Sequence, residues 1–126
     1  ASLIEKEAYH NDERPVIAGV LVNRLQKNML LQFDPTVIYG LGAKYDGTLH
    51  ASDLKEKTPY NTYLNKGLPP TPIAIPSLSS MMAVMHPAQH DYLYFVIENA
   101  KRHRFSSTLK MHQVAVDAYR KQEKQK

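Results

Sequence analysis

Residues 15–28 have the sequence PVIAGVLVNRLQKN, and this stretch says most about the fold. Its large apolar residues recur at the three- and four-residue spacing of one helix face, and they are Val16, Ile17, Val20, Leu21 and Leu25. Pro15 suits the first turn of a helix, where its N–H would have no partner in any case. We therefore predict an amphipathic helix that begins near Pro15 and ends near Asn28.

A short helical segment is predicted before this stretch. Residues 1–8 have the pattern of the last part of a helix, with Ala1, Ile4 and Ala8 on one face. Residues 11–14 are the polar cluster that separates it from the next helix.

Two further helices are predicted in the second half of the chain. Ser77 or Ser79 can cap a helix that continues through Met85 and stops before Pro87. Residues 106–108 can cap a final helix. The buried stripe of that final helix is expected to contain Met111, His112, Ala115, Val116 and Tyr119.

The remaining segments are a hairpin and a long irregular region. Residues 92–97 are the clearest strand, and a return strand is expected around residues 103–105. Residues 29–76 are rich in proline, glycine and tyrosine, with a short helical turn expected at 53–56. Loops of this length in a compact domain are usually functional. The sequence predicts a helix-rich α+β single domain with a small antiparallel sheet and a long irregular region that forms a groove.

Composition narrows the class of protein. The chain has 126 residues, of which 43% are apolar and 22% charged, as expected for one soluble globular domain. The lack of cysteine excludes a disulfide scaffold and a thiolate metal site. The net charge of +4 favours a polyanionic partner such as nucleic acid, an anionic membrane or an acidic polymer. The basic tail, residues 120–126, fits either a solvated helix end or a binding surface.

The ends of the sequence suggest a larger parent protein. No apolar run approaches the length of about 20 residues that spans a bilayer, and there is no signal peptide. The first residue is Ala1, already inside a helical pattern. We therefore expect residues 1–126 to be a fragment of a longer protein.

Most kinds of catalytic site lack their signatures. His86 and His90 are four residues apart, but Pro87 breaks the helix that would align them on a metal ion. The sequence has no G-x-S-x-G elbow, no phosphate-binding glycine loop and no RNA-binding aromatic motif. We expect neither a metal nor a cofactor.

Carboxylates are left as the groups that could act on a substrate. Glu5 and Glu7 lie two positions apart, roughly 200° around a helix axis. Each lies at a margin of the apolar face formed by Ala1, Ile4 and Ala8. Helical spacing alone therefore does not choose between them, and an inert surface role is open for both.

Five blocks of sequence resemble a known family. In order they are ASLIEKE (residues 1–7), LQFDPTVIYG (31–40), YNTY (60–63), GLPP (67–70) and YLYFV (92–96). Together they resemble the catalytic domain of the endolytic murein transglycosylases of the MltG (YceG-like) family. The resemblance covers nearly the whole chain, and the DPTVIYG and YNTY blocks are its most specific parts.

The resemblance implies a lytic transglycosylase of the bacterial cell wall. Members of the family cleave the β-1,4 bond between N-acetylmuramic acid and N-acetylglucosamine inside nascent peptidoglycan strands. The products carry 1,6-anhydro ends, and the cut is expected to end polymerisation by penicillin-binding synthases and so to limit glycan length. Members are anchored in the inner membrane with this domain in the periplasm, so the anchor is expected outside this chain. Nucleic acid is not an expected partner.

The resemblance also implies a catalytic residue. The family's catalytic glutamate is taken as the first glutamate of the ASLIEKE block, which is Glu5. A protonated Glu5 is expected to donate to the glycosidic oxygen and then to accept the proton of the muramic C6 hydroxyl, which attacks C1 of its own ring. Such an acid needs a raised pKa, most simply from an apolar setting. Glu7 is expected to be a structural partner of a base such as Arg24.

Substrate-binding residues are expected in the matching blocks. Gln32 and Asn61 carry amides suited to N-acetyl and hydroxyl groups, and the tyrosines can supply stacking faces or hydroxyl donors. The tyrosines concerned are Tyr39, Tyr60 and Tyr63. An alternative role is equally open for the polar residues: Asp34, Thr36 and Asn61 could simply cap turns.

Some positions depart from the family pattern. Phe33 stands where a small hydroxyl residue usually precedes Asp-Pro, and Ile75-Pro76-Ser77 replaces Asn-Pro-Gly. Both changes are expected in groove segments, so the sugar subsites can differ in detail.

Other functions remain as alternatives. A hydrolytic muramidase could use Glu5 together with Asp34, and a non-catalytic module could bind peptidoglycan and recruit synthases. Binding of nucleic acid through the basic surface is a third class, with steep salt dependence.

Overall fold

The computed structural model describes residues 1–124. It has the predicted architecture, a helix-rich α+β domain with one two-stranded antiparallel sheet. The α-helices are α1 (Ser2–Glu7), α2 (Arg14–Gln26), α3 (Asp34–Leu41), α4 (Leu78–Met85) and α5 (Leu109–Lys124). The strands are β1 (Tyr94–Asn99) and β2 (Arg102–Ser106), and the short 3-10 helices are η1 (Asn11–Glu13), η2 (Gly42–Lys44) and η3 (Ala51–Lys55).

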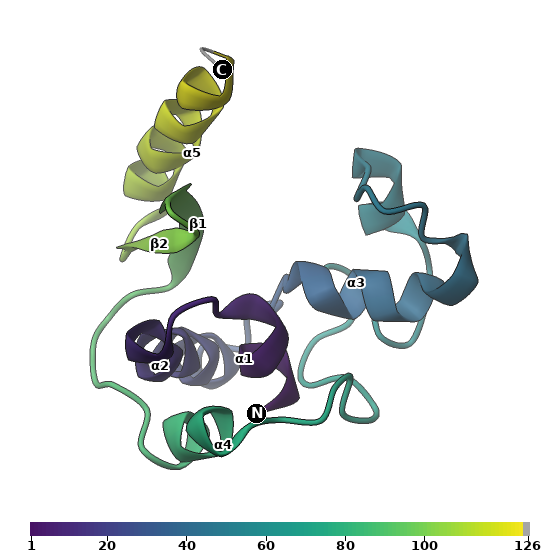
Figure 1. Cartoon of the computed structure of the whole chain (residues 1–126), viewed down its shortest axis with the longest axis horizontal. Coiled ribbons are helices and arrows are strands. Elements are labelled where there is room, and N and C mark those ends of the chain that lie inside the picture. Colours follow the sequence, from purple (N-terminus) through teal and green to yellow (C-terminus); the bar gives the residue numbers. More distant parts are fainter. Residues whose placement is uncertain (125–126) are drawn as a thin grey trace.

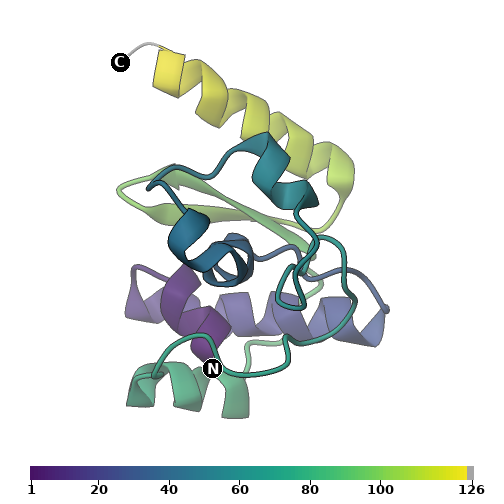
Figure 2. The ribbon, with the colours of Figure 1, turned by 90° about the vertical axis from the view of Figure 1, so that its right-hand side faces the viewer.

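Helix α2 lies at the centre of the main body, as its sequence predicts. Pro15 occupies its first turn, and Ile17, Val20 and Leu21 are buried. In Figure 1 and Figure 2, α5, the hairpin, the α1–α2 pair and α4 follow one another as layers. The core that joins these layers comprises Leu3, Ile4, Ala8, Ile17, Ala18, Leu21, Leu31, Phe33, Ile73 and Ala83.

Helix α4 confirms the predicted capping. Ser77 is its N-cap, and the Ser77 side chain accepts a hydrogen bond from the backbone N–H of Ser80. The helix ends at Met85, before Pro87. It packs mainly against α2 and also contacts α1.

The hairpin and the last helix differ from expectation only in detail. Phe95 of β1 faces Phe105 of β2, and the ring of Phe95 packs edge-on against the buried Phe33. In α5, Ala115 is buried as predicted, but Met111 is 57% exposed, so its place in the buried stripe was wrong. The reason is that α5 covers only a two-stranded hairpin, which buries a narrow strip of the helix.

Helix α3 was not predicted, because residues 29–76 were expected to be irregular. The helix begins at Asp34, has Pro35 in its first turn and ends before Gly42, whose φ of +56° suits glycine. Gly40 lets it approach residue 58 closely, since a Cβ at Gly40 would lie 2.3 Å from the Thr58 Oγ1. The expected turn at 53–56 corresponds to η3.

Two observations concern the surface and the chain ends. Arg120–Lys124, the described part of the basic tail, continues α5 and is exposed, whereas residues 125 and 126 lie outside the described residues. In residues 1–124 no helix is both long enough and apolar enough to cross a membrane.

Candidate active site

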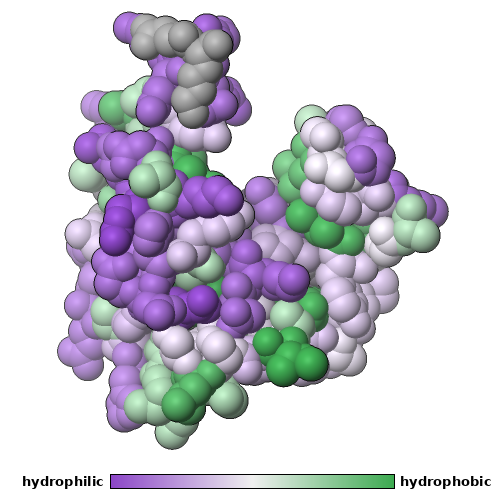
Figure 3. All heavy atoms as spheres, in the orientation of Figure 1, coloured by the Kyte–Doolittle hydropathy of each residue, from purple (hydrophilic) through white to green (hydrophobic). Residues whose placement is uncertain are grey.

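A groove runs between the main body and the part of the chain that carries α3. Figure 3 shows the surface hollowed between the side formed by α5 and the hairpin and the side formed by α3 to η3. Two cavities of about 460 and 500 Å³ lie along it. They share three lining residues, Glu7, Asp34 and Ile97, so the two halves of the groove meet at a pair of carboxylates.

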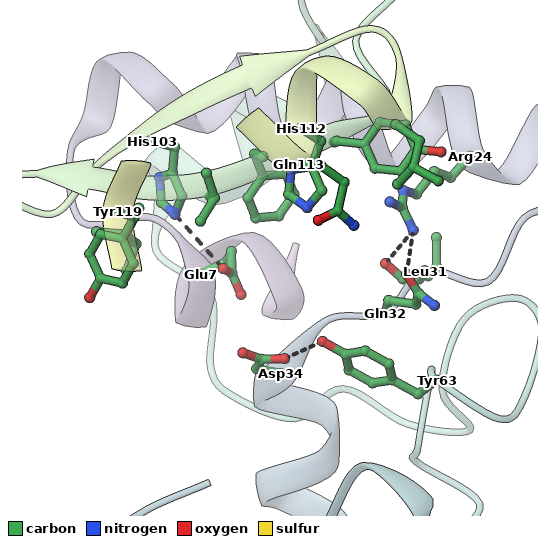
Figure 4. Close-up of a pocket in the computed structure, with 15 residues that line it drawn as sticks. Glu7, Arg24, Leu31, Gln32, Asp34, Tyr63, His103, His112, Gln113 and Tyr119 are labelled. Atoms are coloured by element: carbon green, nitrogen blue, oxygen red, sulfur yellow. Dashed lines mark hydrogen bonds and ion pairs between the residues drawn. The ribbon is translucent and has the colours of Figure 1, made fainter. Parts of the chain in front are cut away.

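Glu7 comes from the last position of α1 and reaches the groove wall. Its side chain is 17% exposed, and its Oε1 lies 3.8 Å from Nε2 of His103. Figure 4 marks this contact with a dashed line. His103 belongs to β2, far from α1 in the sequence, and its side chain is almost completely buried. Glu7 is therefore a partly desolvated carboxyl group at the junction of the two cavities.

Asp34 and Tyr63 lie on the opposite side of the groove from Glu7 in Figure 4. The Tyr63 hydroxyl donates a hydrogen bond of 2.5 Å to Oδ1 of Asp34. Burial and the adjacent Asp34 charge raise the pKa of Tyr63 well above its ordinary value. Tyr63 therefore stays a neutral hydroxyl donor, and Asp34 has one oxygen fixed in position.

Gln32 has a backbone conformation that points to a functional role. Its φ is +55°, a left-handed value uncommon outside glycine, asparagine and aspartate. The backbone N–H of Gln32 bonds to the carbonyl of Thr62, which joins the 31–40 block to the YNTY block. Its side-chain amide lies in the groove, 3.4 Å from Nη1 of Arg24.

Arg24 fixes the end of the groove that lies beyond Gln32. Its guanidinium donates to the carbonyls of Leu93, Leu30 and Leu31, and it lies over the ring of Tyr94. Burial lowers the pKa of Arg24. The residue ties α2 to the segments entering α3 and β1, which are the two walls of the groove.

Glu5 lies outside the lining of both cavities, on the side of α1 that faces α4. Its Oε1 accepts hydrogen bonds from the backbone N–H of Ser77 at 2.7 Å and from the Ser80 hydroxyl at 2.9 Å. Arg14 lies 3.6 Å away. The Ser77 N–H above all, then the Ser77 and Ser80 side chains, and finally the Arg14 charge, lower the pKa of Glu5 to about 2.

Comparison with known proteins identifies the family. The YceG-like family model matches residues 1–118. The chain belongs to the YceG-like family.

Several relatives and one solved structure support this assignment. An endolytic murein transglycosylase of Bacillus subtilis is 48% identical over 119 residues, which is 94% of this chain and 33% of that protein. One of Streptococcus pneumoniae is 38% identical over 102 residues, 78% of this chain and 18% of that protein. The crystal structure of a yceG-like protein from Listeria monocytogenes aligns with a TM-score of 0.84 and 47% identity, covering 90% of this chain and 37% of that one. The chain thus spans a third or less of the length of these curated relatives.

In this YceG-like chain, the predicted binding residues are divided between the groove and the scaffold. Gln32 and Tyr63 line the first cavity, and Tyr39 lines the second. Tyr60 packs against Tyr39 with ring centroids 4.8 Å apart, and its hydroxyl lies 2.8 Å from Oγ1 of Thr71.

Asn61 has the turn-forming role that the sequence left open. It is 1% exposed, and its amide donates to the carbonyls of Leu54 and Glu56 while its Oδ1 accepts from the N–H of Tyr63. Thr36 is likewise buried, and its hydroxyl donates to the carbonyl of Phe33. Asn61 therefore shapes the loop that presents Tyr63.

The two departures from the family pattern lie away from the cavities. Phe33 is buried in the core, and Ile75 is 93% exposed and lines neither cavity. The hydroxyl residue at position 77 caps α4 and contacts Glu5.

Sequence reasoning gave no site role to Glu7, Arg24 or His103. Glu7 was expected to be the partner of a base such as Arg24; the base beside it is His103, and the donors of Arg24 bind backbone carbonyls instead. Glu5 and Glu7 lie at opposite margins of the same apolar face of α1, so helical spacing did not favour Glu7 over Glu5. In residues 1–124 no group of three or more His, Cys, Asp or Glu side chains is placed to hold a metal ion.

Proposed function

We propose that this chain is the catalytic domain of an endolytic murein transglycosylase and that Glu7 is its acid/base. The observation that carries the proposal is the position of Glu7, a partly buried carboxyl at the junction of two cavities. The names of the curated relatives support peptidoglycan as the substrate. A groove that continues on both sides of the acid suits a cut inside a strand, because sugars can bind on both sides of the broken bond.

The chemistry needs one carboxyl group that works twice. A protonated Glu7 donates its proton to the glycosidic oxygen between N-acetylmuramic acid and N-acetylglucosamine, and the bond breaks through an oxocarbenium-like state. The Glu7 carboxylate then accepts the proton of the C6 hydroxyl of the muramic sugar as that oxygen attacks C1. The product has a 1,6-anhydro ring, and no water is consumed. The attack is intramolecular, so proximity replaces a second nucleophile.

Glu5 is a poorer candidate for the acid than Glu7. A general acid must hold a proton at the working pH, and a carboxyl with a pKa of about 2 is ionised there. Its Oε1 is also occupied by the Ser77 N–H and the Ser80 hydroxyl. The sequence prediction of Glu5 and our choice of Glu7 are distinguished by substituting each residue separately.

Substrate binding is assigned to the residues that line the groove. The Gln32 amide is suited to an N-acetyl group, and the Tyr39 ring to a sugar face. Asp34, with Tyr63 donating to it, can stabilise positive charge on the sugar ring in the transition state. Asn61 and Tyr60 contribute by holding Tyr63 and Tyr39 in place.

For the whole protein we propose the setting that the family resemblance implies. Residues 1–126 form one domain of a longer protein anchored in the bacterial inner membrane, with this domain on its periplasmic face. There it cuts strands made by penicillin-binding synthases and limits their length. The location is tested by fusing a topology reporter to this domain in the full-length protein. A reporter signal only from the cytoplasmic side would contradict the periplasmic location.

The reaction is tested by the chemistry of the new ends. Isolated peptidoglycan is digested with the purified chain, and the fragments are analysed by mass spectrometry. We expect 1,6-anhydro-muramic ends with the wild type and none with Glu7→Gln. Reducing ends alone would instead indicate a hydrolytic muramidase, with Asp34 facing Glu7 as the second carboxylate. Strand binding without any cleavage would indicate a non-catalytic peptidoglycan-binding module.

A further inference from the structure

His103 lies between two glutamates that come from different parts of the chain. Its side chain is 1% exposed, with Glu13 of η1 on one side and Glu7 of α1 on the other. The backbone N–H of His103 donates to both carboxylate oxygens of Glu13, at 2.9 and 3.2 Å. Nδ1 lies 2.9 Å from Oε1 of Glu13. Glu13 therefore holds both the backbone and the ring of His103.

These contacts determine which ring nitrogen carries the permanent hydrogen. An ionised carboxylate can only accept hydrogen bonds, and Glu13 already accepts one from the His103 backbone. Nδ1 must therefore be the N–H donor to Glu13, and the protonation of the ring is decided at Nε2. Nε2 is a buried nitrogen without a hydrogen-bond partner, and its neighbour on the groove side is Oε1 of Glu7 at 3.8 Å.

The ring cannot easily turn away from this arrangement. Phe95 packs edge-on against it, with ring centroids 5.2 Å apart, and Phe105 lies at 6.1 Å on the same hairpin. Aromatic contacts of this kind fix the plane of the imidazole. Nε2 is thus aimed at Glu7 by two rings and one carboxylate.

We propose that His103 is a positioning residue that shares one proton with Glu7 and keeps this carboxyl ready to act as an acid. The proposal rests on the proposed function, because it needs Glu7 to be the acid/base. Before the cut, the Glu7 O–H faces the lone pair of Nε2, or its proton is on Nε2 and the carboxylate faces it. After Glu7 has donated to the glycosidic oxygen, it recovers a proton from the C6 hydroxyl. The pair starts and ends each cycle with one proton, so the step is balanced.

The other charged groups around the pair are compatible with this sharing. Burial acts to lower the pKa of His103, but the adjacent carboxylates of Glu7 and Glu13 outweigh it, and the net result is a raised pKa. A raised pKa means that the pair keeps its proton to higher pH than an isolated imidazole would. The remaining titratable residues that line the two cavities around the pair are Asp34, Tyr63, Lys6, Tyr9, Arg24, Tyr39, Tyr94, His112 and Tyr119.

The test is the pH profile of strand cleavage, measured as 1,6-anhydro ends formed from isolated peptidoglycan. His103→Asn keeps a side-chain N–H near Glu13 but has no basic nitrogen facing Glu7. We expect its kcat to fall about tenfold or more at pH 7.5 and to return to within about threefold of wild type near pH 5, because the acid must then hold its proton alone. KM is expected to stay nearly constant. His86→Asn, a change at an exposed histidine at the end of α4 that lines neither cavity, is the matched control and is expected to leave the profile unchanged.

Glu13→Gln provides a second variant in case His103→Asn folds poorly. Its amide oxygen can still accept from Nδ1, but the negative charge that favours the protonated ring is gone. We expect the alkaline limb of the profile to move to lower pH, by less than in His103→Asn. A loss of activity equal at all pH values, or an unchanged limb in both variants, would overturn the proposal. If Glu7→Gln itself still forms anhydro ends, the proposed function fails instead.

Discussion

Helix α1 carries two glutamates in opposite surroundings, one on its α4 side and one on its groove side. Glu5, on the α4 side, has an N–H, a hydroxyl and a guanidinium around a single oxygen. Glu7, on the groove side, lies in the lining of two cavities and has His103 as its neighbour beyond hydrogen-bond distance. The first carboxylate is used to join α1 to α4. The comparison supports the proposal that the carboxyl facing the groove, rather than the one bonded to α4, acts on a substrate.

The largest expected effect is the loss of strand cleavage when Glu7, but not Glu5, is substituted. Glu7→Gln removes the proton that the cut requires, so we expect kcat to fall about 10²- to 10⁴-fold with little change in thermal stability. Glu5→Gln is expected to keep kcat within about threefold. Both are measured as anhydro ends released per folded molecule. The reverse pattern, activity lost in Glu5→Gln and kept in Glu7→Gln, would restore the sequence prediction of Glu5.

The next largest effect is a loss of folding stability when the contacts between Glu5 and α4 are broken. The Ser80 hydroxyl is buried between Glu5 at 2.9 Å and the Arg14 guanidinium, so Ser80→Ala leaves both charged partners short of a bond. We expect the free energy of unfolding to fall by about 2 kcal/mol. Ser79→Ala, at a half-buried neighbour whose hydroxyl contacts Asn11 instead, is the control and is expected to stay within about 0.5 kcal/mol. Chemical denaturation measures both; equal values would contradict a structural role for the Glu5 cluster.

A smaller effect is expected across the groove from Glu7. Tyr63→Phe removes the hydroxyl that holds Oδ1 of Asp34 while keeping the ring. We expect kcat/KM to fall about tenfold, the size of one lost hydrogen bond to a charged group. Tyr45→Phe, at a tyrosine that lines neither cavity, serves as the control in the same assay. Activity equal to the control would show that the Asp34–Tyr63 pair is not used.

The smallest effect is the pH dependence of stability that comes from Glu5. Its folded pKa is below its unfolded value, so its contribution is complete above about pH 5 and is lost as the pH falls toward 2. Because the carboxylate is partly solvated, we expect that contribution to be only about 1 kcal/mol. Wild type and Glu5→Gln should therefore differ at pH 7 and converge near pH 2. A constant difference from pH 7 to pH 2 would contradict the ionised state of Glu5.

The elements that local patterns define were predicted well. The apolar spacing in residues 15–28 and the hydroxyl of Ser77 are local signals, and α2 and the cap of α4 follow from them. Helix α3 was missed because Asp34-Pro35 and Gly40 also occur in turns. In the fold, the helix buries Val37 and Leu41 and packs Gly40 closely against Thr58. Asn61 could bind a sugar or cap a turn, and the neighbouring carbonyls of Leu54 and Glu56 decide for the turn.

The sequence by itself determined the α+β class, the hairpin, four of the five α-helices seen in residues 1–124 and the blocks that mark the family, because each depends on residues close together in the chain. Only the tertiary structure shows that Glu5 and Glu7 have different surroundings, and our proposal of Glu7 rests on that difference. Both lie at the margin of the same apolar face, and helical periodicity treats the two margins alike. The choice depends on which partner packs against each margin: α4 brings Ser77 and Ser80 to Glu5, and β2 brings His103 to Glu7. These partners are separated from α1 by about 70 to 100 positions, so no local pattern contains them.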